Sequence, residues 1–178
     1  RDLLALHEQI GQLVGTDAWS LLGYRATERL LRAAGRAADA DRVARSTRAY
    51  AAAFGAALAA TGSADVPPAW QPGGIDWGNL STVYPCAVLA PSDPRAAALA
   101  RRYFAPLGGP GLGYYGRPTL LHTYVAADLG TWAMLAGRRV EAERVLDALL
   151  RARSASGGEA ETFEAATGDF GTNLPPHA

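Results

Sequence analysis

Apolar residues recur every three or four positions along most of the chain, which is the spacing of one face of a helix. Residues 2–14 show it with Leu3, Leu6, Ile10 and Leu13, and residues 39–60 with Val43, Thr47, Tyr50, Phe54 and Leu58. The same spacing predicts further helices over residues 16–36, 93–104, 118–136 and 140–153. No segment alternates convincingly between apolar and polar residues, so the sequence predicts an all-α protein without strands.

Turn and capping residues punctuate these helices. Thr16 or Asp17 is placed to cap the helix over 16–36, and the pair Asp93-Pro94 combines a capping residue with proline at the first helical position. Gly62 and Gly137 follow the last apolar positions of two helices, where glycine commonly ends a helix. The predicted order is therefore helix, tight glycine turn, helix, and then a longer crossing.

An internal repeat supports this order. The stretch AGRAADADRV at Ala34–Val43 matches AGRRVEAERV at Ala136–Val145 at six positions, 102 residues apart. In both copies the tripeptide AGR closes one helix, and a charged and then apolar stretch opens the next. The repeated unit is an αα-hairpin, and the chain holds roughly three of them.

An array of αα-hairpins forms either an open solenoid or a ring closed into an α/α toroid. The segment 118–136 is apolar nearly all round, as expected of an inner helix of a ring. The crossings 62–92 and 105–117 differ in length, whereas solenoid connections tend to repeat. We therefore expect a single partial domain over residues 1–178, about half of an (α/α)6 toroid. Within it, residues 1–61 are rich in hairpins, 62–92 form a Trp/Gly loop, and 93–178 combine hairpins with an acidic loop.

Composition excludes several classes of function. The 17 basic residues, all of them Arg, balance 17 acidic ones, so neither a nucleic acid nor an acidic membrane is an expected partner. The single cysteine, Cys86, excludes an internal disulfide and a Cys-rich zinc site, and it is predicted to be a buried thiol. Three scattered histidines lack metal-ligand spacing, and the Gly-rich loop 108–116 lacks the order of a phosphate-binding loop, so no metal or cofactor is expected.

Apolar runs, composition and the two ends of the chain bear on its localisation and its completeness. The chain has no apolar run long enough to span a bilayer and no recognisable signal peptide, which predicts a cytoplasmic protein. The exclusive use of Arg, with abundant Ala, Gly and Pro, indicates a bacterial genome rich in G and C. Pro175 and Pro176 are typical of the start of a helix, and the chain lacks an initial Met, so we expect a piece of a longer protein.

The Trp/Gly loop is the first candidate for chemistry. It reads WQPGGIDWGNLSTVYP and places Trp70, Trp77 and Tyr84 around Asp76 and Asn79. Indole faces beside a carboxylate and an amide suit a sugar. The C–H face of the sugar ring stacks on the indole, and the sugar hydroxyls form hydrogen bonds with the carboxylate and the amide. Alternatively, the tryptophans plug one end of the helical array and Asp76 caps a helix.

The acidic loop is the second candidate. Glu159, Glu161, Glu164 and Asp169 fall within eleven residues, beside Phe163 and Phe170. Hydrolysis of a glycosidic bond needs one protonated carboxyl to expel the leaving group and one ionised carboxyl to activate water. Acids crowded near aromatic rings can acquire separated pKa values. Alternatively, these acids form an ordinary solvated surface.

Three stretches together resemble the C-terminal half of the six-hairpin, (α/α)6-toroid glycoside hydrolases. They are GGIDWGNLSTVYP, LGTWAMLAGRRVEAERVLDALL and ETFEAATGDFGTNLPPHA. The last stretch is similar to a glucoamylase-type pattern, Glu-Gln-aromatic-Asp-x-x-Thr-Gly followed by Asn-x-Pro and a helix that opens with His or Ser. The resemblance is spread over residues 70–178 and implies that Glu161 is the general base. Thr162 and Glu164 depart from the pattern, which leaves the choice of base open between Glu161 and Glu164.

The second carboxylate and most of the substrate contacts are candidates from the loops of this chain. Asp76 is the local candidate for the second carboxylate, although substrate binding suits it equally well. The general acid of these families usually lies further upstream than this chain reaches. His122 is a candidate sugar contact or a hydrogen-bonded core histidine. The full set of predicted substrate-binding residues is Trp70, Trp77, Asn79, Tyr114, Tyr115, His122, Asp169, Asn173 and His177.

The sequence thus predicts inverting hydrolysis of a glycosidic bond in an oligo- or polysaccharide. Two alternatives stay open: a tetratricopeptide-like, non-catalytic module that binds a protein, and a toroid that binds sugar without catalysis. Half a toroid exposes the apolar sides of its terminal hairpins, so self-association is also expected.

Overall fold

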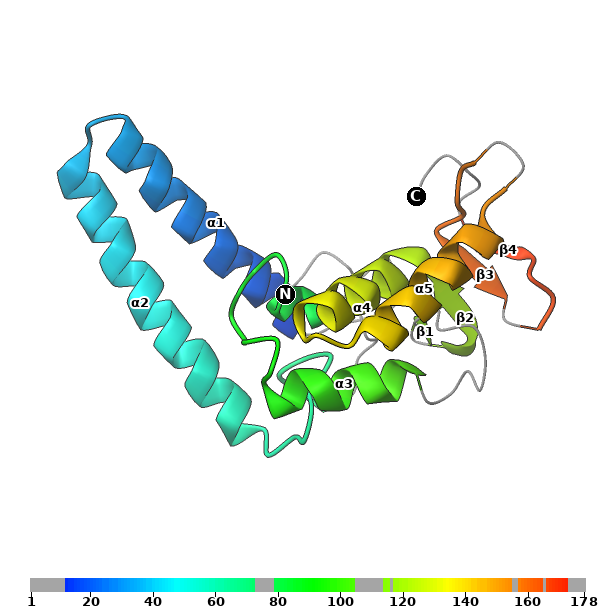
Figure 1. Cartoon of the computed structure of the whole chain (residues 1–178). Coiled ribbons are helices and arrows are strands. Elements are labelled where there is room, and N and C mark those ends of the chain that lie inside the picture. The colour runs from blue at the N-terminus through cyan, green and yellow to red at the C-terminus, as the bar shows by residue number, and fades with distance from the viewer. Residues whose placement is uncertain are drawn as a thin grey trace.

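Two antiparallel helix pairs dominate the computed structural model, which describes residues 12–72, 79–104, 114–115, 117–154, 157–164 and 166–172. The first pair is α1 (Val14–Ala33) with α2 (Ala37–Ala60), and the second is α4 (Thr123–Leu135) with α5 (Arg139–Ala152). Between them lie the short 3-10 helix η2 (Asn79–Thr82) and α3 (Pro94–Phe104). The α1–α2 pair extends away from the other elements (Figure 1). The chain is predominantly helical, as the sequence predicts.

The repeated AGR tripeptides form two turns of the same geometry. Gly35 and Gly137 adopt left-handed backbone conformations with φ of 72° and 71°. The next amide reaches back across each turn, from Arg36 N–H to the Leu31 carbonyl (2.9 Å) and from Arg138 N–H to the Ala133 carbonyl (2.8 Å). This is the Schellman arrangement, which needs a residue that tolerates positive φ. The helix–turn–helix order predicted from the repeat is therefore confirmed at both places.

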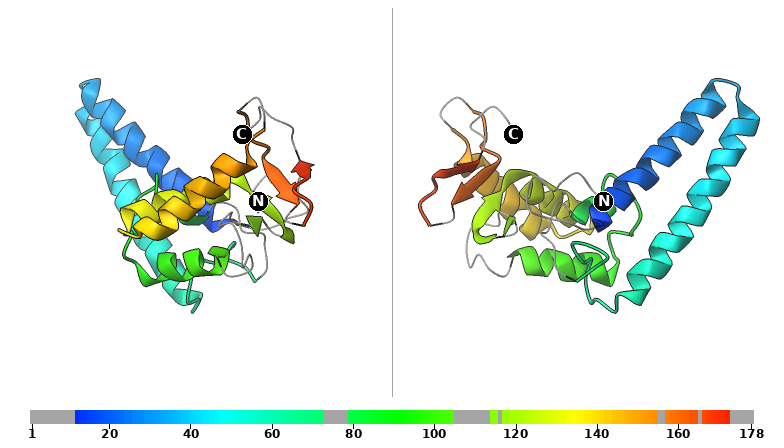
Figure 2. Two further views of the ribbon diagram at one scale, coloured as in Figure 1. Left: turned by 45° about the vertical axis from the view of Figure 1, so that its right-hand side comes forward. Right: turned by 180° about the vertical axis from the view of Figure 1, so that it is seen from behind.

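A small antiparallel sheet contradicts the expectation that the chain has no strands. It contains β1 (Tyr114–Tyr115), β2 (Arg117–His122), β3 (Thr162–Glu164) and β4 (Phe170–Thr172), in that order. Figure 2 shows the sheet at the end of the molecule opposite the α1–α2 pair. The predicted helix over 118–136 begins only at Thr123, because residues 120–122 pair with 162–164. A short apolar run fits a strand as well as a helix, and here a partner distant in sequence decides between them.

The predicted inner helix is buried on one face only. α4 buries Val125, Ala126, Leu129, Trp132 and Ala133. Its other side leaves Met134 and Leu135 at 65% and 51% exposure, so the expectation of a helix buried on most sides is wrong. Closure of the hairpins into a toroid stays a prediction.

One apolar core joins the helices to the sheet. It runs from Leu21 of α1 and Phe54 of α2 through Leu99 of α3 and Leu129 of α4 to Phe163 of β3. No helix in the described ranges is both long and apolar enough to cross a membrane.

Asp17 fastens the base of the α1–α2 pair to the segment that follows α2. Its carboxylate accepts a hydrogen bond from the Tyr50 hydroxyl of α2 and another from the Trp70 indole N–H (2.5 Å). The Trp70 ring packs edge-on against Phe54, with 5.2 Å between ring centroids. Three segments distant in sequence therefore meet at one carboxylate.

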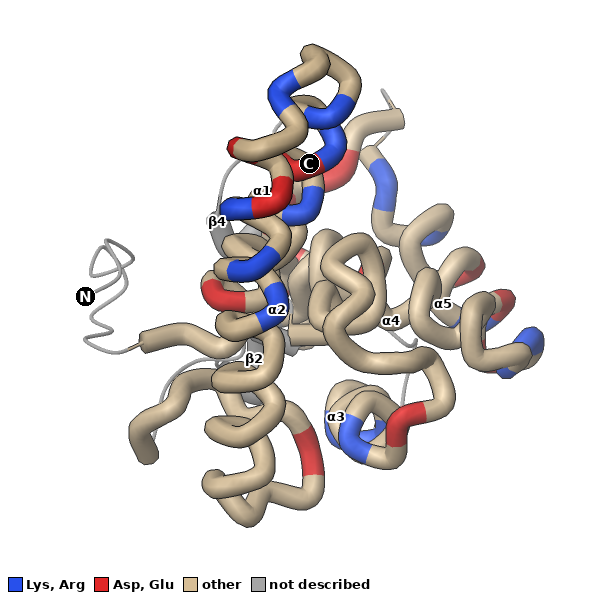
Figure 3. Tube along the Cα trace, turned by 90° about the vertical axis from the view of Figure 1, so that its left-hand side faces the viewer, with Lys and Arg blue, Asp and Glu red and all other residues tan. Residues whose placement is uncertain are grey.

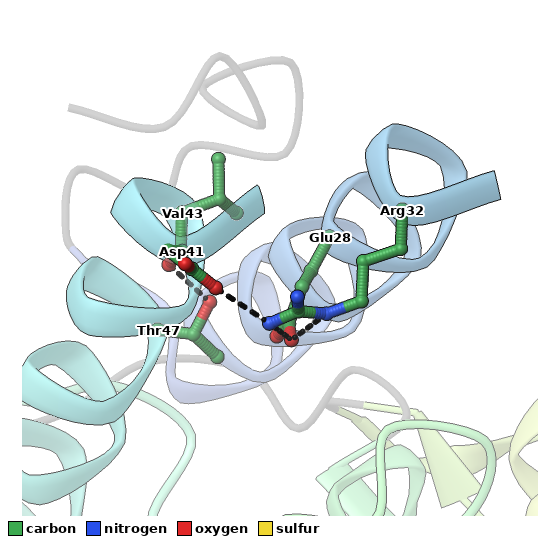
Figure 4. A network of polar contacts seen from close by, with 5 residues as sticks. All are labelled: Glu28, Arg32, Asp41, Val43 and Thr47. Carbon is green, nitrogen blue, oxygen red and sulfur yellow. Dashed lines mark hydrogen bonds and ion pairs between the residues drawn. The ribbon is translucent and has the colours of Figure 1, made fainter. Parts of the chain in front are cut away.

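Polar contacts on the surface connect α1 and α2 toward the outer end of the pair. Acidic and basic residues are interleaved along both helices (Figure 3). Arg32 bridges Glu28 and Asp41 with distances of 3.1 and 3.0 Å, and the Thr47 hydroxyl donates to the Val43 carbonyl (2.9 Å) (Figure 4). Ion pairs this exposed to solvent add little to stability, so the apolar base carries most of the stability of the pair.

The matched turns generate a stability prediction. Nothing lies within 4 Å of a Cβ added at Gly35 or Gly137, so alanine there meets only the cost of positive φ. We expect Gly35→Ala and Gly137→Ala to lower the free energy of unfolding by about 1 kcal/mol each. Gly55→Ala is the control, because Gly55 lies inside α2 with open space around it and should gain about 0.5–1 kcal/mol. Urea titration measures all three, and a neutral Gly137→Ala would contradict the strain argument.

Candidate functional site

The candidate site forms where β2 ends and α4 begins. His122 is the last residue of β2 and the N-cap of α4, and its Nδ1 accepts a hydrogen bond from the Tyr124 backbone N–H (3.1 Å). The expectation that His122 lies on a helix is therefore wrong, because His122 ends the strand that precedes α4. Its capping bond and burial, with 1% exposure, agree with the hydrogen-bonded core histidine considered as the alternative.

The strand that follows α5 returns to this junction and places Glu161. The backbone N–H of Thr123 donates to the Glu161 carbonyl (3.1 Å), and the Thr123 hydroxyl donates to the Ala160 carbonyl (3.1 Å). The next residue, Thr162, pairs with His122 across the sheet. Main-chain contacts on both sides thus fix the backbone of Glu161 beside the start of α4.

The side chains of His122 and Glu161 face each other. The distance from His122 Nε2 to Glu161 Oε1 is 3.7 Å, and the Glu161 side chain is 15% exposed. Because Nδ1 accepts a hydrogen bond, the proton of a neutral imidazole sits on Nε2, on the side of the carboxylate. Burial lowers the pKa of His122 to about 4 in spite of the nearby Glu161 charge. The imidazole is therefore neutral at pH 7.

Two other acids of the acidic loop, Glu164 and Asp169, lie on the β3–β4 hairpin. Glu164 is half-buried at the end of β3, where its N–H donates to the Asp169 carbonyl (2.8 Å). Asp169 itself is exposed, as is expected of a solvated surface. Of the predicted site residues whose side chains are described, the structure brings Glu161 and His122 into direct contact.

Trp70 and Asn79 have structural contacts instead of an open sugar-binding face. The Asn79 amide is 1% exposed and donates to the Pro67 carbonyl (2.9 Å). Trp70 is half-buried and bound to Asp17, as described above. Both observations agree with the alternative in which this loop plugs one end of the helices.

Asp76, Trp77, Asn173 and His177 lie outside the described residues. The backbones of Tyr114 and Tyr115 form β1, where Tyr114 pairs with Leu121 of β2. In the described segments, no group of three His, Cys, Asp or Glu residues is arranged to hold a metal ion.

Asp128 is a titratable group that the sequence-based search missed. It lies half-buried on α4, six residues after His122 and so about 9 Å further along the helix axis. Burial raises the pKa of the Asp128 carboxyl to about 7. Burial also raises the pKa of the nearby Cys86 thiol to about 11, and the Asp128 charge adds to that shift. A lone acid within an apolar helical stretch is the sequence signal that could have identified Asp128.

The second helix pair carries an apolar groove of about 550 Å³ on its outer side. Gly130 of α4 lets α5 approach, since a Cβ there would lie 3.1 Å from Val145 Cγ1. Large apolar side chains are exposed on the same pair, namely Met134, Leu135, Val140, Leu146 and Leu150.

No protein-family model, curated protein or solved structure matches the chain. The resemblance to toroid glycoside hydrolases therefore stays a prediction that rests on the motifs and on the site.

The two shifted groups generate a prediction about pH. Folded Asp128 keeps its proton up to about pH 7 while an unfolded one loses it near 3.8, so its contribution to stability falls as pH rises through that range. Folded His122 is neutral down to about pH 4 while an unfolded one charges near 6.5, so its contribution rises with pH between those values.

The variants Asp128→Asn and His122→Gln separate these two contributions. In urea titrations from pH 4 to 7, the unfolding free energy of Asp128→Asn should increase relative to wild type as pH rises. That of His122→Gln should decrease relative to wild type over the same range. Changes of the same sign in both variants would contradict the assignment.

The exposed apolar groove bears on the expected self-association, which stays a prediction. If that face associates, Leu146→Gln with Leu150→Gln should lower the sedimentation coefficient at high protein concentration. Leu30→Gln is the matched control, because Leu30 is 70% exposed but lies on α1. An equal effect of the control, or a wild type that sediments as a monomer throughout, would contradict the prediction.

Proposed function

We propose that the chain belongs to an inverting glycoside hydrolase and that Glu161 is its general base. The observation that carries the proposal is the contact between Glu161 and a neutral, buried His122 at the junction of β2 and α4. A general base needs an ionised carboxylate in a fixed position. The main-chain bonds of Thr123 favour the fixed position, and the Nε2–H of His122 points toward the carboxylate at 3.7 Å.

In this proposal the Glu161 carboxylate takes a proton from a water molecule as the water oxygen attacks the anomeric carbon. The glycosidic C–O bond breaks on the opposite face, and a protonated carboxyl gives its proton to the leaving oxygen. Attack from the opposite face inverts the anomeric configuration. Room for the water requires the two carboxyl groups to be roughly 6.5–9.5 Å apart.

Two carboxyl groups of this chain are candidates for the acid. Asp76 is the candidate from the sequence. Asp128 is the candidate from the structure, because its pKa of about 7 leaves it largely protonated at mildly acidic pH. Supply of the acid from elsewhere in the natural gene product is the third candidate, implied by the resemblance. The pH–rate profiles of Asp76→Asn and Asp128→Asn distinguish the three, since loss of the true acid removes the alkaline limb.

A protein-binding helical module is the second candidate function. The matching AGR turns and the apolar groove of the α4–α5 pair favour it, because helical-repeat proteins commonly bind partners along helix faces. A toroid that binds sugar without hydrolysis is the remaining alternative, and it would show saccharide binding without turnover.

The test of catalysis uses the natural gene product that carries this chain. Glu161→Gln should abolish hydrolysis of oligosaccharides, a loss of at least about a hundredfold in kcat, and leave KM and the far-UV circular dichroism spectrum unchanged. Glu159→Gln is the matched control two residues away, and Glu164→Gln tests the competing choice of base.

Proton NMR of the freshly formed sugar tests the stereochemistry. Appearance of the anomer opposite to that of the substrate supports inversion. Full activity of Glu161→Gln with loss of activity in Glu164→Gln would move the base to Glu164. Absence of hydrolysis in the wild type across a broad panel of glycosides would overturn the proposal.

A further inference from the structure

A second cavity, of about 390 Å³, lies between α3 and the α4–α5 pair. The side chains that matter for its chemistry are Arg101 and Phe104 of α3, Trp132 of α4, and Arg138, Glu141 and Arg144 around the start of α5. Its volume is in the range of small-molecule sites. Trp132 lies nine residues after Thr123, roughly 13 Å along the α4 axis, so this cavity is separate from the Glu161 site.

The cavity has an excess of positive charge although the whole chain is balanced. Among the described residues that line it, three carry a guanidinium group and one carries a carboxylate. The Arg138 Nε donates to Glu141 Oε1 (2.7 Å), so that carboxylate is already committed to a neighbour. Arg101 and Arg144 add two further positive charges to the lining, so its net charge stays positive whichever guanidinium contacts Glu141. The positive end of the α5 helix dipole adds to it, since α5 begins directly after Arg138.

Two of these side chains are arranged together. The Arg144 guanidinium carbon lies 5.8 Å from the centre of the Phe104 ring, a cation–π contact. A stacked guanidinium presents its N–H donors at the rim of the stack, in the plane that suits the two oxygens of a phosphate or carboxylate. Arg101 precedes Phe104 by three residues on α3 and so lies on the same side of that helix.

Aromatic rings form the apolar part of the cavity wall. Trp132 is 3% exposed, and its indole N–H donates to the Pro91 carbonyl (3.1 Å). This bond fixes the plane of the indole. Phe104 adds a second ring, which is half-buried. A ligand entering this cavity therefore meets guanidinium groups, one of them stacked on Phe104, and an aromatic surface at the same time.

We propose that this cavity binds a small organic anion, in which a phosphate or carboxylate is attached to a flat apolar ring. The oxyanion contacts Arg101 and Arg144, and the ring packs against Phe104, next to the small part of Trp132 that lines the cavity. The site does not use Glu161, so this proposal does not depend on the proposed glycoside hydrolysis.

Isothermal titration calorimetry with four probes tests this assignment at about 0.15 M salt, where non-specific attraction to surface charge is screened. The probes are phenyl phosphate, benzoate, inorganic phosphate and benzyl alcohol. We expect phenyl phosphate or benzoate to bind, and the stronger of the two identifies the oxyanion. Inorganic phosphate and benzyl alcohol should each bind at least about tenfold more weakly, because each lacks one half of the ligand. Equal binding of benzyl alcohol would overturn the proposal.

Variants and a direct probe locate the binding. Arg101→Gln with Arg144→Gln should weaken the bound aromatic anion by about tenfold or more, since both changes remove charged donors. Arg48→Gln is the matched control, an exposed arginine on α2. The Trp132 indole N–H resonance of the wild type should shift on titration. An unmoved Trp132 resonance, or equal weakening by Arg48→Gln, would refute the site.

Discussion

The change from strand to helix between His122 and Thr123 is the constraint on which the candidate site depends. One imidazole caps α4 through Nδ1 and faces Glu161 through Nε2, while the next residue binds the backbone of residues 160 and 161. The sheet, the helix and the carboxylate are therefore positioned by the same two residues. A displacement of β3 along β2 would separate Glu161 from His122 and would also remove partners of Thr123.

Local signals in the sequence account for most of the helical fold. Glycine at the AGR turns, Pro94 after Asp93, and the apolar spacing of α1, α2 and α5 each act within a few residues, so they can be recognised without the structure. β2 is different because its hydrogen-bonding partner, β3, lies about forty residues away. Within residues 117–122, the adjacent Leu120 and Leu121 fit a strand as well as a helix, and only the pairing decides between them.

The candidate site was predictable by residue but not by arrangement. Glu161 and His122 were each singled out from the sequence, yet their contact arises from sheet pairing that the sequence does not display. Trp70 and Asn79 have the composition of a sugar site, but burial and the bonds to Asp17 and Pro67 give them structural roles. The raised pKa of Asp128 comes from burial, which depends on how α4 packs and is not visible in the sequence.

The long α1–α2 pair has a consequence for motion. No residue between positions 22 and 39 is buried, whereas the base of the pair holds Leu21, Phe54 and the Asp17 contacts. The free energy of local opening should therefore rise steadily from the AGR turn toward the base, and amide protons near Gly35 should exchange with solvent first. The outer end of the pair can fray and re-form while the Glu161 site, on the far side of the core, keeps its geometry.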